Sequence, residues 1–185
     1  MSRSIYYLPG HGGRLETGLG EALLSRGFDI AGRETVGEFR SIPFSEQVAV
    51  IAEDLTSRYW HEDARVIANS FGAYLFLHAQ SLMKPFPGNV LLLSPIVGEF
   101  STENAMMGFI PPHAERLLAL ASSGSYPVPR QCEIHVGEQD WQSNPHTVVE
   151  FADFLGLKVT LVPNTGHMLG RSYVGGVLDN WLRTT

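Results

Sequence analysis

The chain has 185 residues and a formal net charge of −6. A chain of this length is expected to fold as one domain over residues 1–185. Its negative net charge and the lack of any basic cluster in the sequence argue against nucleic acids and anionic membranes as partners. A single cysteine excludes an internal disulfide framework. No N-terminal signal peptide and no apolar run of about 18 residues is visible, so we expect a cytoplasmic protein with no membrane contact.

Strand-like and helix-like segments alternate along the chain. Short continuous apolar runs, such as residues 90–93, are typical of strands in a parallel sheet covered on both faces. The alternation predicts a doubly wound α/β domain with a mostly parallel sheet of six strands and helices on both faces. Strands are predicted over 4–8, 28–36, 65–69, 89–94, 131–136 and 158–163, and helices over 15–26, 44–60, 71–83, 112–122, 144–155 and 172–183.

The junction of the third strand and the third helix contains a candidate nucleophile, Ser70. An apolar strand ends at Asn69, and a helix-permissive run begins just after the serine. Ala68 and Gly72 flank Ser70 at minus two and plus two, where a sharp turn requires small side chains. A hydroxyl on such a turn lies at a helix N-terminus, where unpaired N–H groups favour developing negative charge.

Two later loops contain candidate partners for this serine. Asp140 follows the predicted strand 131–136, and His167 follows the predicted strand 158–163. The order Ser, acid, His, with one helix and one strand between the last two, is the order of the α/β-hydrolases. The chain resembles that family over nearly its whole length, and in size and layout it is similar to the small retinoblastoma-binding serine hydrolases.

The resemblance implies a strand order of 2-1-3-4-5-6 and a catalytic triad of Ser70, Asp140 and His167. A serine hydroxyl needs an adjacent base, which His167 would supply while Asp140 holds its imidazole in the productive tautomer. Glu138 and Glu99 remain alternatives for the acid, because they lie in the same loop and in the loop after the preceding strand.

The family also implies an oxyanion hole made of two backbone N–H groups. One belongs to the residue after the nucleophile, Phe71, and the other is expected in the loop after the first strand, at Gly13. His11 in that loop is expected to line the site rather than to act as the base.

The chain is too short for the cap domain of many α/β-hydrolases, and a lid-like excursion over residues 96–125 is expected in its place. Adaptable methionines and aromatic residues near a nucleophile suit an apolar acyl or alcohol pocket. The predicted lining residues are His11, Met106, Met107, Phe109, Trp141 and Met168.

The sequence therefore predicts a serine hydrolase that cleaves small-molecule carboxylic esters through an acyl-enzyme. Thioesterase, amidase or peptidase specificity would use the same triad, and a binding module with an unused triad stays open as a second class. No cofactor or metal is expected, because the glycine-rich stretches lack the third glycine of a dinucleotide fingerprint and nothing completes a metal site beside His61.

Overall fold

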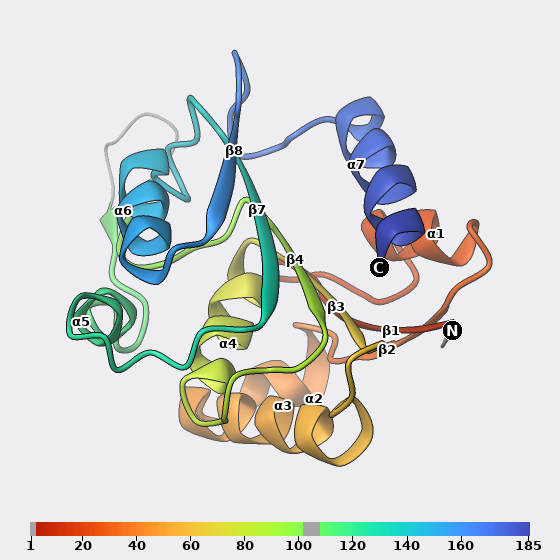
Figure 1. Ribbon diagram of the computed structural model, residues 1–185, viewed down its shortest axis with the longest axis horizontal. Coiled ribbons are helices and arrows are strands. Elements are labelled where there is room, and N and C mark those ends of the chain that lie inside the picture. The colour runs from red at the N-terminus through yellow and green to blue at the C-terminus, as the bar shows by residue number, and fades with distance from the viewer. Residues whose placement is uncertain (1–2, 102–107) are drawn as a thin grey trace.

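The computed structural model describes residues 3–101 and 108–185, and a parallel sheet of six strands forms its centre (Figure 1). The spatial order is β2-β1-β3-β4-β7-β8, and every neighbouring pair is parallel. Counted within this sheet alone, the order is 2-1-3-4-5-6, as predicted. The strands are β1 (Ser4–Leu8), β2 (Asp29–Gly32), β3 (Arg65–Asn69), β4 (Asn89–Leu93), β7 (Gln131–Gly137) and β8 (Lys158–Val162).

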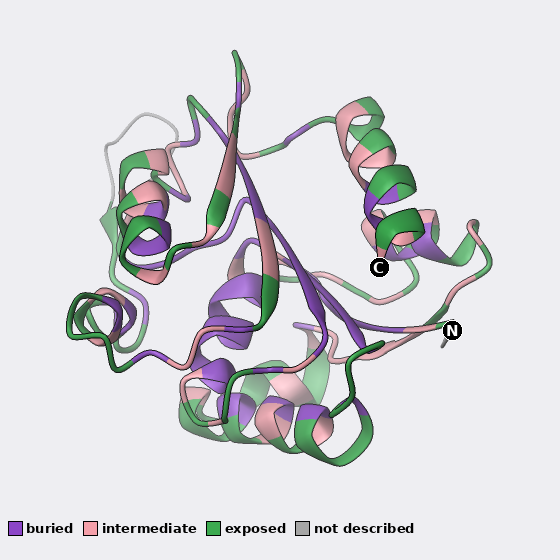
Figure 2. Ribbon diagram, viewed as in Figure 1, coloured by how far each residue is buried: buried purple, intermediate pink, exposed green. Residues whose placement is uncertain are grey.

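Helices cover both faces of this sheet. Alternate side chains of β1 point to opposite faces, so that Tyr6 and Leu8 join one apolar cluster and Ile5 and Tyr7 the other. The larger cluster lies under α3, α4, α5 and α6, and the smaller lies under α1 and α7. Figure 2 shows the buried strands between these layers. The helices are α1 (Leu19–Leu24), α2 (Gly37–Ser41), α3 (Phe44–Arg58), α4 (Phe71–Gln80), α5 (Arg116–Ser122), α6 (Pro145–Leu155) and α7 (Arg171–Thr184).

The second predicted strand, 28–36, is too long. Strand β2 ends at Gly32, whose φ of +146° is a conformation that L side chains rarely adopt. Beyond it the chain turns toward the loop after β1, where the N–H of Thr35 donates to the carbonyl of Gly13 at 3.1 Å. The short helix α2 then occupies residues that were not predicted to be helical.

The segment 96–125 contains more structure than the predicted helix. Strands β5 (Phe100–Ser101) and β6 (Gly108–Phe109) pair antiparallel in a separate two-stranded sheet, and α5 begins at Arg116 rather than at residue 112. Single-domain organisation and a lid in this segment stay predictions. No helix within the described residues has the length and apolar character needed to span a membrane.

Candidate active site

The candidate nucleophile Ser70 lies on a strained turn between β3 and α4. Its φ of 52° and ψ of −121° are rare for a residue with a side chain, and such strain concentrates at functional sites. A Cβ atom added to Gly72 would lie 2.2 Å from the carbonyl oxygen of Leu8, so the helix can approach β1 only with glycine there. Ala68 is fully buried on the strand side. The tight packing explains the small residues on either side of Ser70.

Ser70, His167 and Asp140 form a continuous hydrogen-bonded chain. The Oγ atom of Ser70 lies 2.9 Å from Nε2 of His167, and Nδ1 of His167 lies 3.0 Å from each carboxylate oxygen of Asp140. The three residues come from loops after β3, β7 and β8, at the carboxyl ends of parallel strands. The structure thus brings together the three side chains that the sequence analysis paired.

Asp140 is the carboxylate that contacts His167. It is 2% exposed, and its Oδ1 atom accepts the backbone N–H groups of Gln142 at 2.9 Å and Ser143 at 2.8 Å. These bonds hold the carboxylate in place. Glu138 is exposed and accepts the N–H of Asn164, and Glu99 is also exposed. Neither alternative acid contacts the imidazole.

The loop after β1 lies against Ser70, but the predicted donor Gly13 is already engaged. Its N–H donates to the carbonyl of Gly10 and to the Oγ1 atom of Thr35, both at 2.9 Å. Gly13 is therefore a wrong choice for the second oxyanion donor, because its N–H closes a turn within the loop. A Cβ atom at Gly10 would lie 3.2 Å from the Cβ of Ser70, so the peptide that leads into His11 is next to the nucleophile.

Among the other predicted lining residues that the structure describes, His11, Phe109 and Met168 are exposed and Trp141 is half-buried. The Trp141 ring lies 6.1 Å from that of His167, and the His11 ring meets the edge of Phe71 at 5.9 Å. Phe109 stacks on Phe100 at 5.2 Å and is 43% exposed, whereas Met168 is 85% exposed. The predicted residues Met106 and Met107 lie outside the described residues.

A buried histidine lies further along α4, behind the nucleophile. His78 is 3% exposed and packs against the rings of Tyr74 and Phe44, at 4.4 and 5.1 Å. Burial, with the nearby charges of His113 and Arg116, lowers the pKa of His78 to about 4. His78 is thus a neutral packing residue near pH 7.

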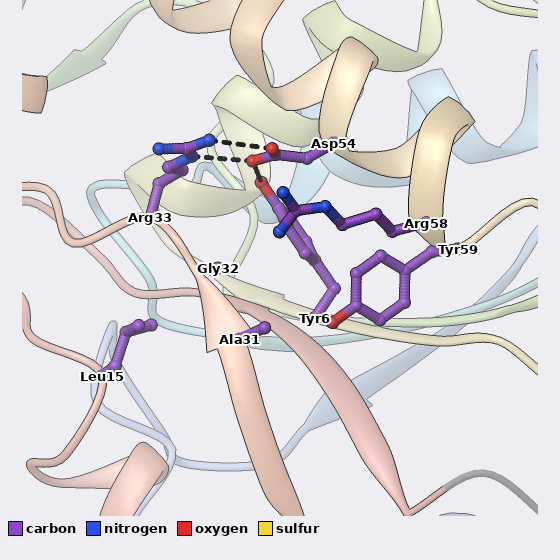
Figure 3. Close-up of a pocket in the computed structure, with 8 residues that line it drawn as sticks. All are labelled: Tyr6, Leu15, Ala31, Gly32, Arg33, Asp54, Arg58 and Tyr59. Carbon is purple, nitrogen blue, oxygen red and sulfur yellow. Dashed lines mark hydrogen bonds and ion pairs between the residues drawn. The ribbon is translucent and has the colours of Figure 1, made fainter.

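A cavity of about 250 Å³ lies away from the triad, between β1, β2 and α3 (Figure 3). Its carboxylate, Asp54, accepts two bonds from Arg33 at 2.7 and 2.8 Å and one from the Tyr6 hydroxyl at 2.8 Å. Burial raises the pKa of Asp54, but these hydrogen bonds outweigh it and the pKa falls below its usual value. The network links β1 and the residue that follows β2 to α3, which is a structural role. The lining residues are Tyr6, Leu15, Ala31, Gly32, Arg33, Asp54, Arg58 and Tyr59.

Two buried serines beside Asp140 and His167 were missed by the sequence analysis. Ser94 follows β4, and its hydroxyl donates to the carbonyl of His167 at 2.9 Å. The Oγ atom of Ser143 lies 3.4 Å from Nδ1 of His167. The spacing Asp-x-x-Ser was an available signal for Ser143, because a carboxylate at a turn commonly accepts N–H groups two and three residues later. Ser94 had no such signal.

Within residues 3–101 and 108–185, no three histidine, cysteine, aspartate or glutamate side chains are grouped as a metal site would require. Cys132 lies in β7, where burial and the nearby Glu133 raise its thiol pKa to about 12.

Comparisons with known proteins place this arrangement among solved structures. No family model matches the sequence, and neither does any curated protein. Mouse alpha/beta hydrolase domain-containing protein 10 is similar with a TM-score of 0.69 at 12% identity, over 98% of this chain and 90% of that one. Est1E from Butyrivibrio proteoclasticus is similar with a TM-score of 0.67 at 14% identity, over 99% and 88%.

A CIB-like hydrolase from Thermoplasma acidophilum is similar with a TM-score of 0.65 at 14% identity, over 99% of this chain and 87% of that one. At these identities the likeness concerns the backbone, and it extends over nearly the whole of each chain. Together with the order of the six parallel strands, it shows that this chain has the α/β-hydrolase fold.

Proposed function

We propose that this protein is a serine hydrolase that cleaves carboxylic esters of small to medium apolar acyl groups. The observation that carries the proposal is the unbroken chain from Ser70 Oγ through the imidazole of His167 to the buried carboxylate of Asp140. The hydrolases and esterases of the same fold add support, although they share only 10–16% of their residues with this chain.

In the first half of the reaction, Ser70 Oγ attacks the ester carbonyl carbon while its proton moves to Nε2 of His167. The Asp140 carboxylate stabilises the imidazolium that forms. The tetrahedral intermediate then collapses and the bond to the alcohol oxygen breaks. That oxygen takes the proton from Nε2, and an acyl group remains on Ser70.

In the second half, water replaces the alcohol. His167 takes a proton from the water as it attacks the acyl carbon, and the second tetrahedral intermediate expels the Ser70 oxygen. The proton returns to Ser70, so that the carboxylic acid leaves and the resting enzyme is restored.

The oxyanion of both intermediates needs two N–H donors. Phe71 would supply one, since it is the first residue of α4 and directly follows the nucleophile. His11 would supply the other in place of Gly13. The backbone before it lies against Ser70, and within the described part of the chain its N–H has no hydrogen-bond acceptor.

The substrate class follows from the side chains around the triad. The Trp141 ring lies beside that of His167, Phe71 directly follows the nucleophile, and the exposed Met168 directly follows His167 as a flexible apolar side chain. Such surfaces favour apolar acyl or alcohol groups over charged ones. We therefore expect p-nitrophenyl esters with acyl chains of about two to eight carbons as substrates.

Labelling with a fluorophosphonate probe, followed by peptide mapping, tests the proposal directly. We expect an adduct on Ser70 in the wild type and none in Ser70→Ala. Exposed Ser122 offers a matched control, because Ser122→Ala removes only a hydroxyl that donates to Ala119 within α5. A folded wild type that forms no adduct and turns over no ester would overturn the hydrolase proposal in favour of a binding module.

A further inference from the structure

We infer that Ser143 is a positioning residue that helps Asp140 to fix the tautomer of His167. The inference deepens the proposed function and rests on it for its consequence in catalysis. Ser143 is 2% exposed and touches two partners besides Asp140: the carbonyl oxygen of Ser94 at 2.6 Å and Nδ1 of His167 at 3.4 Å.

The direction of the first hydrogen bond determines the direction of the second. A carbonyl oxygen can only accept, so the hydroxyl proton of Ser143 is committed to Ser94. The Ser143 oxygen can then offer only lone pairs to the imidazole. Those lone pairs are compatible with a protonated Nδ1 and repel an unprotonated one.

Among the described residues, Nδ1 of His167 consequently faces three oxygen atoms and no donor. Two belong to the carboxylate of Asp140, at 3.0 Å each, and the third is Ser143 Oγ at 3.4 Å. The third contact is long for a hydrogen bond, so its contribution is electrostatic and modest. All three favour the tautomer with a proton on Nδ1, which leaves Nε2 free to accept the Ser70 proton.

The position of Ser94 keeps the Ser143 proton from turning away. Ser94 is 4% exposed, and its N–H donates to the carbonyl of His135 at 2.7 Å while its hydroxyl donates to the carbonyl of His167 at 2.9 Å. Its own carbonyl is therefore held beside Ser143. Rotation of the Ser143 hydroxyl toward the imidazole would remove the bond to that carbonyl, which is costly in a buried site.

The same residue also orders the acid. The N–H of Ser143 donates to Oδ1 of Asp140 at 2.8 Å, a backbone contact that survives any side-chain replacement. Side-chain variants of Ser143 therefore test the hydroxyl and leave the carboxylate held. We expect Ser143→Ala to lower kcat about 3- to 10-fold with little change in KM, since the loss is that of one modest polar interaction.

The decisive measurement is the tautomer of His167 in the resting protein, read from imidazole ¹⁵N chemical shifts at pH 8.5. The resonances are assigned with His167→Gln. In the wild type we expect the Nδ1-protonated form alone, and in Ser143→Ala a measurable fraction protonated on Nε2. Ser122→Ala removes an exposed hydroxyl that donates only within α5, so the His167 tautomer in this control should match the wild type.

Ser143→Cys supports the test if the alanine variant does not fold, because sulfur fills the site but interacts weakly. A folded variant with wild-type tautomer populations and wild-type kcat would overturn the role of Ser143. The spectra need no turnover, so a shifted tautomer in a protein that cleaves no ester would uphold the positioning role and count against the proposed function alone.

Discussion

Replacing Gly137 with alanine should move the loop that carries His167 without unfolding the protein. Gly137 is the last residue of β7, and a Cβ atom there would lie 2.2 Å from the carbonyl oxygen of Thr165 and 2.3 Å from that of Gly166. Ordinary contacts of this kind begin at 3.4 Å. The backbone just before His167 must therefore shift by about 1 Å.

A shift of that size is large for catalysis and moderate for stability. Misplacing a catalytic group by about 1 Å costs on the order of 10²-fold in rate. Inserting a methyl group into a closely packed site costs about 1–3 kcal/mol of unfolding free energy. We therefore expect kcat/KM for p-nitrophenyl acetate to fall about 100-fold in Gly137→Ala while the far-ultraviolet circular dichroism stays that of the wild type.

Gly176→Ala is the matched control for this experiment. Gly176 lies in the interior of α7, and a Cβ atom there meets nothing within 4 Å. Alanine is the better helix former, so the control should gain about 0.5–1 kcal/mol of stability and keep full activity. A Gly137→Ala protein with wild-type kcat/KM would refute the reasoning, because the His167 loop would then have to accommodate the new methyl group without moving Nε2.

Three further predictions concern the triad, the cysteine and the buried histidine. In steady-state kinetics, Ser70→Ala and His167→Ala should each lower kcat by about 10²–10⁴-fold, and the double variant should lose little more. If the losses of the two single variants multiplied in the double variant, Ser70 and His167 would not act as a unit. The thiol of Cys132 has a pKa of about 12, so it should react slowly with maleimide in the native protein at pH 7.5 and rapidly in protein unfolded by urea. Rapid labelling of the native protein would contradict the buried environment of this thiol. The pKa of His78 is about 4 in the folded chain and 6.5 in its ordinary, unfolded state. The unfolded chain therefore takes up a proton more readily, so the stability of the folded protein should fall as the pH drops from 6.5 to 4. The free energy of unfolding is measured in urea at pH 7 and at pH 4. Between these two pH values the wild type should lose up to about 3 kcal/mol more than His78→Gln. Equal losses in the two proteins would contradict the role of His78.

Several features of this protein follow from local sequence alone. Short, largely apolar runs and their spacing placed all six strands of the main sheet, because strands covered on both faces are mostly apolar. The small residues beside Ser70 indicated a sharp turn, and the resemblance of the order Ser70, Asp140, His167 to that of the α/β-hydrolases implied their meeting. Each of these signals is carried by residues close together in sequence or by the regular alternation of strands and helices.

Other features depend on contacts between distant segments. The end of β2 at Gly32 results from its approach to Tyr7, and the engagement of the Gly13 N–H results from Thr35, which lies 22 positions away. Neither partner has a local sequence signal, so strand 28–36 was predicted too long and Gly13 was predicted as a free donor.

The surroundings of His167 show the same division. The sequence by itself determined which three residues carry the proposed chemistry, since their types and loop positions are readable along the chain. Only the tertiary structure decided that Asp140 rather than Glu138 or Glu99 reaches the imidazole, and that Ser94 and Ser143 surround it. The physical reason is that hydrogen bonds act over about 3 Å, and only folding brings loops after β4, β7 and β8 within that distance.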